Sequence, residues 1–467
     1  MRQQDGGRTY GAAPWERQKE GDTMAKRFSR VQTIALGFLL IIAAGTILLM
    51  LPAASRDGQS AGFLNSLFTA TSSTCVTGLV VVDTYTNWTL FGQIVILMLI
   101  QAGGLGFITI GIFFSIFLKR KIGLKERNLI QESVNTLQIG GTVRLVRKIV
   151  CYTAVIEGTG ALLLMVRFIP KFGWLKGIWY GIFHSVSAFC NAGFDLMGQF
   201  EPYGSLTMYY DDVLVNLVIM ALILIGGIGF IVWDDISIHK WRVRKYLLHT
   251  KIVLAMTLVL TVGGSILFYV FEQGNLLAGM DMKGQVLSSL FGAVTPRTAG
   301  FNTIDTGAYS EGTRLLTILL MFIGGSPGST AGGVKTTTMM VILLYIWSNL
   351  RNKKGLNIFG RRLDEDSVKK ASTVFFINLL LASASSLLMF GLEGSMAMSD
   401  VLMEIFSAIG TVGISTGITR DVTVASKYLL ILLMYSGRIG SMSFALSFTE
   451  KKQGSLVRLP IERITIG

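Results

Sequence analysis

The chain has little charge and few of the residues that build disulfides, metal sites or hydrolytic centres. Charged residues make up 15% of its 467 residues, and it has only 3 histidines and 3 cysteines. Soluble globular chains carry about 25% charged residues, so a cytosolic enzyme is disfavoured. The cysteines, Cys75, Cys151 and Cys190, form no CxxC pair and predict no disulfide framework. The sequence contains no HExxH motif, so we expect no enzymatic activity.

Apolar residues are abundant instead. They make up 51% of the chain, and the mean hydropathy is +0.56. Eight runs reach the roughly 20 residues that cross a bilayer. They cover residues 32–52, 91–118, 146–168, 213–236, 250–271, 314–347, 371–391 and 428–448. The first run is too long for a signal peptide and follows a disordered or basic lead, residues 1–31. The sequence therefore predicts an all-α membrane protein with eight transmembrane helices.

Basic residues are distributed unevenly between these runs. Segments 1–31, 119–148, 239–251, 349–370 and 449–467 hold 31 of the 42 Lys and Arg residues, and the alternating loops hold 9. The positive-inside rule then places both termini in the cytoplasm of a multi-pass cell-membrane protein. The net charge of +14 thus describes orientation and indicates no nucleic-acid partner. The basic loops either attract anionic membrane lipids or dock a partner.

A fourfold internal repeat is centred on one glycine. The segments CVTGL, CNAGF, RTAGF and GTVGI contain Gly78, Gly193, Gly300 and Gly413. Each follows an apolar stretch that is too short to span a bilayer, a length typical of re-entrant segments. We expect four parallel repeats, each a helix, a re-entrant loop and a second helix, around one pore. Their predicted bounds are residues 32–118, 146–238, 250–347 and 371–448, followed by a cytoplasmic tail, 449–467.

The glycine-centred loops are predicted to form a selectivity filter. Irregular backbone at membrane depth persists only where protein buries it or where it lines a water-filled path. Glycine permits dihedrals that turn carbonyl oxygens toward a central axis, where they replace the hydration shell of K⁺. The alternative is that these glycines only allow close helix packing. The predicted ion-binding residues are Cys75, Val76, Thr77, Gly78, Cys190, Asn191, Ala192, Gly193, Arg297, Thr298, Ala299, Gly300, Gly410, Thr411, Val412 and Gly413, with K⁺ at the four loop glycines.

A gate is predicted where the run 314–347 is interrupted. Residues 324–338, GGSPGSTAGGVKTTT, contain five glycines and a proline, which prevent a continuous helix. We expect an intramembrane loop that blocks the pore below the filter. For Lys335, snorkelling or capping of the broken helix is the alternative. The predicted gate residues are Gly324, Gly325, Ser326, Pro327, Gly328, Ser329, Thr330, Gly332, Gly333, Lys335 and Arg438.

Arg438 lies in the last apolar run, where an unpartnered cation costs at least about 2.5–3.5 kcal/mol. In the first two repeats we align its position with Leu105 and Ile228. We expect the side chain to point at the pore, donate hydrogen bonds to carbonyls of the 324–338 loop, and repel cations when the path is shut.

From about residue 25 to its end, the chain resembles the Trk/Ktr/HKT family of potassium-uptake proteins, most closely the KtrB-type membrane subunits. The four degenerate loops with one glycine each, together with the 324–338 stretch, carry this resemblance. It implies K⁺ uptake by a homodimer with one pore per subunit. It also implies a cytosolic ring of RCK-type regulatory subunits, on which ATP or ADP binds, with Na⁺ as a candidate activator.

A secondary symporter that couples K⁺ to Na⁺ or H⁺ is the alternative function. It requires a carboxylate near the membrane midplane, and Glu157 in the third run is the obvious candidate. A hydrogen bond from Glu157 to a neighbouring helix is the other interpretation. Asp195, just after Gly193, is expected either to draw cations to the outer mouth or to face water. His184 is expected to pack rather than to bind a ligand.

Overall fold

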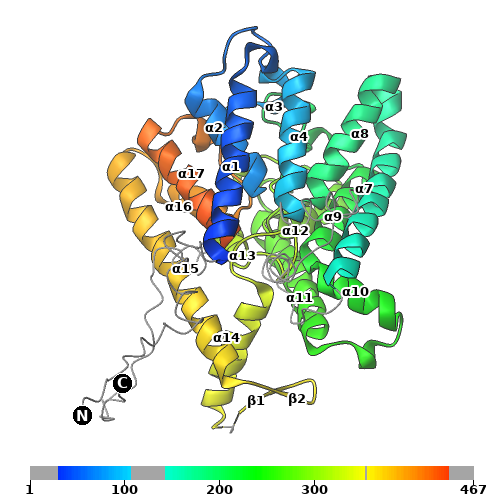
Figure 1. Cartoon of the computed structure of the whole chain (residues 1–467), viewed down its shortest axis with the longest axis vertical. Helices are drawn as coiled ribbons and strands as arrows, with labels where there is room; N and C mark the ends of the chain where they lie inside the picture. The colour runs from blue at the N-terminus through cyan, green and yellow to red at the C-terminus, as the bar shows by residue number, and fades with distance from the viewer. Residues whose placement is uncertain (1–29, 107–141, 353–354, 441–467) are drawn as a thin grey trace, which may run out of the picture.

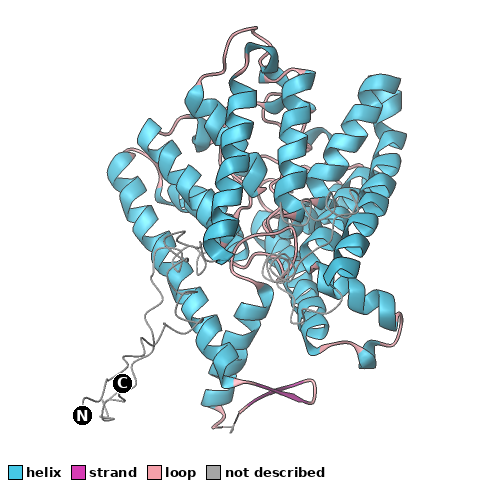
Figure 2. Ribbon diagram, viewed as in Figure 1, coloured by secondary structure: helices cyan, strands magenta, loops and turns pink. Residues whose placement is uncertain are grey.

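The computed structural model describes residues 30–106, 142–352 and 355–440, whose regular secondary structure is almost entirely helical (Figures 1 and 2). Within these ranges the only sheet is an antiparallel hairpin of β1 (Leu356–Ile358) and β2 (Arg361–Leu363). The helical fold class is therefore as predicted. The predicted tail 449–467 and nearly all of the lead 1–31 lie outside the described residues.

Four long helices are apolar enough to cross a membrane. They are α1 (Arg30–Met50), α7 (Thr142–Phe172), α11 (Leu248–Glu272) and α15 (Glu365–Leu392). Their outer faces carry large apolar side chains, and Leu40, Leu162, Leu258 and Leu380 are each more than half exposed. Water would penalise such faces and lipid would not, which places these helices in a bilayer.

A short helix follows each long helix and packs against it. These are α2 (Phe63–Cys75), α8 (Trp174–Phe189), α12 (Met282–Val294) and α16 (Met398–Gly410). With 13 to 16 residues, none is long enough to cross a bilayer. Their C-terminal turns are buried, and Ser72, Ser187 and Ser407 are fully inaccessible. Each short helix therefore delivers the chain to a loop glycine inside the protein.

A third helix follows each short helix, and each such set of three helices, with its connecting segments, is here called a unit. The third helix of each unit is shorter than the predicted span. These helices are α4 (Leu90–Leu105), α9 (Val213–Ile228), α13 (Glu311–Phe322) and α17 (Val424–Ile439). Three of them end at a glycine with positive φ, namely Gly106 (79°), Gly229 (98°) and Gly440 (93°). The predicted run 213–236 covers two helices, because the chain bends by 95° at Gly229 into α10 (Phe230–His239). The ends of the predicted spans 91–118 and 428–448 lie outside the described residues.

The predicted break in the run 314–347 is present. Residues 323–335 separate α13 from α14 (Thr336–Leu350). Thr336 to Thr338 were predicted to belong to the loop, but they form the first turn of α14. The reason is that no glycine or proline follows Gly333 to oppose helix formation there.

Among the described residues, four helices have the length and hydropathy of a span, or five if α9 and α10 are one bent span. Eight spans and their fourfold repeat stay a prediction. The short connecting helices are α3 (Thr84–Asn87), η1 (Pro52–Ala54), η2 (Met197–Gln199), η3 (Thr207–Tyr209), η4 (Val243–Lys245), η5 (Thr306–Ala308) and η6 (Ile418–Arg420).

Glycines let α4, α9 and α17 lie directly against the ends of the short helices. A Cβ added at one glycine of each helix would strike a backbone carbonyl oxygen. Each of these carbonyls belongs to the residue four positions before a loop glycine. The pairs are Gly103 with Thr74, Gly226 with Phe189, and Gly437 with Ile409. These glycine clusters therefore serve close packing, which fixes how near the loops come to one another.

Candidate functional site

The four predicted filter loops share one backbone conformation. In each loop the glycine has a positive φ, and so does the residue two positions before it. A left-handed conformation costs a residue with a side chain roughly 1–2 kcal/mol, so its recurrence shows that the surroundings impose it. The φ values are 57° and 96° for Val76 and Gly78, 61° and 67° for Asn191 and Gly193, 70° and 83° for Thr298 and Gly300, and 51° and 91° for Thr411 and Gly413.

Each loop glycine faces the carbonyl oxygen that precedes the glycine of the next loop. A Cβ at Gly78 would lie 2.5 Å from the Ala192 oxygen, and one at Gly300 would lie 2.5 Å from the Val412 oxygen. Side chains do not fit at such distances, so only glycine allows this approach. The loops thereby close into a ring in chain order. The full cycle runs from Gly78 to Ala192, from Gly193 to Ala299, from Gly300 to Val412, and from Gly413 to Thr77.

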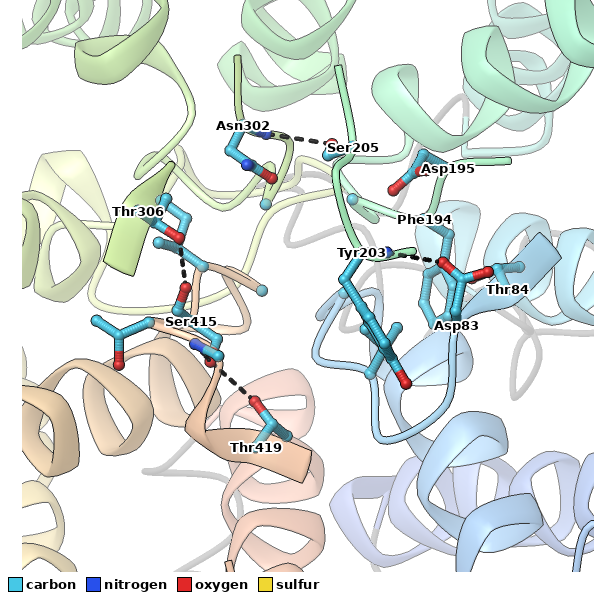
Figure 3. A pocket seen from close by; sticks show the side chains of 18 of the residues that line it. Asp83, Thr84, Phe194, Asp195, Tyr203, Ser205, Asn302, Thr306, Ser415 and Thr419 are labelled. Carbon is cyan, nitrogen blue, oxygen red and sulfur yellow. Dashed lines mark hydrogen bonds between the residues drawn. The ribbon is translucent and has the colours of Figure 1, made fainter. Parts of the chain in front are cut away.

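The ring borders a cavity of about 160 Å³, here called the glycine cavity, which all four loop glycines line. Its wall consists of the segments that follow each loop, so all four units contribute to it (Figure 3). Oxygen-bearing groups predominate on this wall. Its polar side chains are Asp83, Thr84, Asp195, Tyr203, Ser205, Asn302, Asp305, Thr306, Ser415, Thr416, Thr419 and Arg420.

The segment 203–206 connects the walls of the cavity. The backbone N–H of Tyr203 donates to the Asp83 carboxylate at 3.1 Å, and the Ser205 hydroxyl accepts from the N–H of Asn302 at 3.3 Å (Figure 3). The guanidinium of Arg420 lies over the Tyr203 ring, 4.3 Å from its centroid. This segment of the second unit thus contacts the first, third and fourth units, and these contacts fix the shape of the cavity wall.

Asp195 lies in the loop after α8, on the cavity wall (Figure 3). Burial, together with the nearby negative charge of Asp83, raises the pKa of Asp195 to about 7. A carboxyl group with a raised pKa loses its charge as pH falls through that value. Asp195 therefore changes charge near neutral pH, which gives the wall a variable negative charge.

Residues 323–335 lie beneath the ring, against other units. The N–H of Ser326 donates to the Gly227 carbonyl at 3.0 Å, and the N–H of Phe230 donates to the Gly328 carbonyl at 2.7 Å. The Thr330 hydroxyl donates to the carbonyl of Phe189, at the end of α8, at 3.2 Å. The broken segment is therefore held by the second unit and replaces the missing helical hydrogen bonds with these contacts.

Arg438 joins this segment to the first unit. Its guanidinium donates to the carbonyls of Thr330 and Gly103, and to that of Gly104 at 3.1 Å. The expected hydrogen bond to the 324–338 loop is thus observed. The alignment of Arg438 with Leu105 and Ile228 was off by one residue, because the packing of Gly437 matches that of Gly103 and Gly226. Arg438 therefore stands where the first two units have Gly104 and Gly227.

Lys335 bonds within its own loop. Its ammonium donates to the carbonyls of Ala331 at 2.7 Å and Gly332 at 3.1 Å. It also precedes the first residue of α14 as the N-cap. The side chain makes no capping hydrogen bond to α14, so the role of Lys335 stays a prediction.

Asn191 and Arg297 occupy predicted filter positions but use their side chains differently. The Asn191 amide donates to the Arg297 carbonyl at 3.3 Å and to the Thr298 hydroxyl at 3.2 Å, and its oxygen accepts from Thr330. It therefore links two loops and the 323–335 segment, a role that its sequence position does not indicate. The Arg297 guanidinium turns away to the Thr257 hydroxyl of α11, at 3.2 Å. Of Arg297, only the backbone belongs to the ring.

Glu157 and His184 support the second loop from behind. The Glu157 carboxylate accepts from the Gln101 amide at 3.2 Å and lies 3.8 Å from the Cys190 sulfur. Glu157 is thus hydrogen-bonded to the neighbouring helix α4, as one of the two interpretations expected. It does not line the glycine cavity. His184 accepts from the N–H of Leu196 at 3.3 Å. Within the described residues no group of three His, Cys, Asp or Glu could hold a metal.

The long apolar helices and the ring of four glycine loops define an ion-transporting membrane protein. The chain belongs to the TrkH family, described as cation transport proteins, whose family model matches residues 9–459.

Two relatives match nearly the whole chain. The Potassium/sodium uptake protein NtpJ of Enterococcus hirae is 42% identical over 448 residues, which is 95% of this chain and 98% of the relative. The Ktr system potassium uptake protein B of Bacillus subtilis is 41% identical over 443 residues, 94% of this chain and 97% of the relative. The crystal structure of the potassium transporter TrkH from Vibrio parahaemolyticus shares the fold, with a TM-score of 0.71 and 18% identity over 91% of this chain and 86% of that chain.

Proposed function

We propose that this chain takes up K⁺ across the cell membrane by conducting it through the ring of loop glycines. The observation that carries the proposal is the cycle of glycine-to-carbonyl approaches, which sets four backbone strands around one axis. Backbone carbonyls around an axis replace the hydration shell of K⁺ without the charge that would favour small divalent ions. The loops 75–78, 190–193, 297–300 and 410–413 are then the selectivity filter.

Two further features support a cation as the transported species. The helices α2, α8, α12 and α16 each end shortly before a loop, so the partial negative charge at their C-termini lies near the ring. Asp83, Asp195 and Asp305 border the glycine cavity and add negative charge. K⁺ itself is proposed because the relatives at 41–42% identity are named for potassium uptake, and the name of one also includes sodium. Na⁺ remains a candidate activator.

The 324–338 segment and Arg438 are proposed to be the gate. The segment lies beneath the ring, and Arg438 bonds it to carbonyls of α4, which draws the first, third and fourth units together. A buried guanidinium on this path would repel K⁺, and its hydrogen bonds to the segment would hold the path closed. Opening requires these bonds to break and the segment to move aside.

The remaining architecture is proposed from the sequence and its resemblance. Four repeats, 32–118, 146–238, 250–347 and 371–448, would contribute eight spans with both termini in the cytoplasm. The active form would be a homodimer in contact with membrane lipids. A cytosolic RCK-type ring that binds ATP or ADP would regulate it by docking to basic segments such as 239–251 and 349–370.

Flux measurements on purified protein in liposomes test this function. We expect uptake of radioactive Rb⁺ that K⁺ competes for more effectively than Na⁺, with a reversal potential that follows the K⁺ gradient alone. Absence of K⁺-competed Rb⁺ flux would overturn the proposal. A reversal potential that shifts with pH or Na⁺ would instead identify a coupled symporter.

A further inference from the structure

Glu404 is a fully buried carboxylate on α16, the short helix that leads to the fourth loop. One carboxylate oxygen accepts hydrogen bonds from the hydroxyls of Ser415, at 3.1 Å, and Thr419. The other oxygen, Oε2, is inaccessible and has no hydrogen-bond partner. A buried carboxylate in this state either takes up a proton or is compensated by a positive charge, because neither water nor further donors stabilise its charged form.

The hydroxyls bonded to Glu404 belong to the wall of the glycine cavity. Ser415 lies two residues after Gly413, and both Ser415 and Thr419 line the cavity (Figure 3). The Ser415 carbonyl also accepts from the Thr306 hydroxyl at 2.6 Å, which ties this wall to the third unit (Figure 3). Glu404 therefore stands one residue behind the surface that a cation in the cavity would meet.

No basic side chain in the described ranges forms an ion pair with Glu404. Asp400, one turn earlier on α16, is itself paired with Arg314 at 2.9 Å. Arg420, the basic side chain on the cavity wall, lies over the Tyr203 ring and donates to the Gly417 carbonyl at 3.1 Å. The protein thus places cationic partners on neighbouring groups and leaves Glu404 without one.

The residue at the position of Glu404 in the second unit is His184, and it supports its loop by hydrogen bonds without carrying a charge. Nine residues before the loop glycines stand Thr69, His184, Phe291 and Glu404. His184, like Glu404, supports the chain that follows its loop. The Nε2 atom of His184 accepts from the Leu196 N–H, and its Nδ1 atom donates to the Tyr180 carbonyl at 2.8 Å. An imidazole with one accepting and one donating nitrogen is neutral. A neutral side chain suffices to support a loop, so the carboxylate at Glu404 supplies something more.

We propose that Glu404 is the buried countercharge for the transported cation in the glycine cavity and raises the affinity of the cavity for K⁺. This inference rests on the proposed function of the cavity as the ion path. Glu404 acts through Ser415 and Thr419 and is a positioning and affinity residue, without direct contact to the ion. Its charge raises cation occupancy at low external K⁺ and matters little when K⁺ is saturating.

The test compares Rb⁺ uptake kinetics of the wild type, Glu404→Gln and Glu393→Gln in proteoliposomes. Glutamine keeps the acceptor oxygen for Ser415 and Thr419 and removes the charge. We expect Glu404→Gln to raise KM on the order of tenfold with the maximal rate retained, the size of a charge interaction across about 10 Å at an effective dielectric constant of about 20. An unchanged KM would overturn the inference.

Glu393→Gln is the matched control. Glu393 belongs to the same unit and accepts from the N–H and hydroxyl of Thr423 at 2.7 and 2.8 Å, but it does not line the cavity. It should leave KM unchanged, and an equal rise in both variants would assign the effect to lost packing. If Glu404→Gln fails to fold, Glu404→Thr decides, because Thr69 stands at the same position in the first unit. It also removes the charge, so KM should rise on the order of tenfold, and an unchanged KM would overturn the inference. Absence of saturable uptake in the wild type would instead refute the ion path itself.

Discussion

Replacement of Gly300 by alanine tests whether the ring of loop glycines selects the ion. Gly300 has a φ of 83°, which costs an alanine about 1–2 kcal/mol. The added Cβ would also lie 2.5 Å from the Val412 oxygen, against at least 3.4 Å for an ordinary contact, so one strand must move by about 0.9 Å. A shift of that size in a carbonyl ring changes the coordination distance of every ion it holds.

The expected magnitude follows from these costs. If this strain of about 1–2 kcal/mol reduces the free-energy difference that favours the larger ion, Rb⁺, over Na⁺, the ratio of Rb⁺ to Na⁺ uptake falls roughly five- to thirtyfold. The assay is uptake of radioactive Rb⁺ and Na⁺ into liposomes at matched protein density. Thermal unfolding of both proteins in detergent shows whether the variant is folded.

Gly58→Ala is the matched control, because Gly58 has a φ of 67° but no atom within 4 Å of the added Cβ. It carries the same conformational cost without the contact at the ring, so ion preference should not change. Wild-type preference in folded Gly300→Ala protein would refute the reasoning. An equal loss in Gly58→Ala would show that general destabilisation, and not the ring, sets the preference.

Three other predictions follow from described contacts. Arg438→Gln removes charge-assisted hydrogen bonds to the carbonyls of Thr330 and Gly104, worth about 1.5–3 kcal/mol each, and should raise Rb⁺ flux through the isolated subunit at least tenfold; unchanged flux would exclude the gate. Acidification of the outer solution from pH 8 to 6 should protonate Asp195, whose pKa is raised by burial to about 7, and lower uptake at limiting K⁺. The Asp195→Asn variant should show low uptake at pH 8 and no further loss on acidification. If its uptake still falls with pH, another group causes the pH dependence. Gly103→Ala drives a Cβ into a backbone carbonyl and should destabilise the protein by about 1–3 kcal/mol, measured as a lower Tm; an unchanged Tm would contradict the close packing of α4.

The loop glycines were recognisable from the sequence because their role depends on the backbone conformation and not on a side chain. A position that requires positive φ and lacks room for a Cβ accepts only glycine, so it recurs at a fixed place in every repeat. The predicted break after α13 was recognisable for the same reason, since five glycines and a proline oppose a helix whatever surrounds them.

Side-chain roles were not recognisable in this way. Asn191 and Arg297 both lie just before a loop glycine, yet one side chain bridges two loops and the other turns to α11. Glu404 gave no sequence signal, because its importance comes from the absence of a basic partner in three dimensions. The register of Arg438 was misplaced by one residue until the packing of Gly437 against Ile409 fixed it.

The sequence by itself determined the helical membrane class, the four glycine positions and the broken third unit, because hydropathy, φ preference and helix propensity are local properties of the chain. Only the tertiary structure decided the cyclic order in which each glycine meets the next loop, the bend at Gly229 and the partners of Arg438 and Glu404. The cyclic order and the partners of Arg438 depend on surfaces that lie far apart in the sequence, and the surroundings of Glu404 depend on which charged groups pack near it. Such contacts follow from packing and charge compensation in three dimensions.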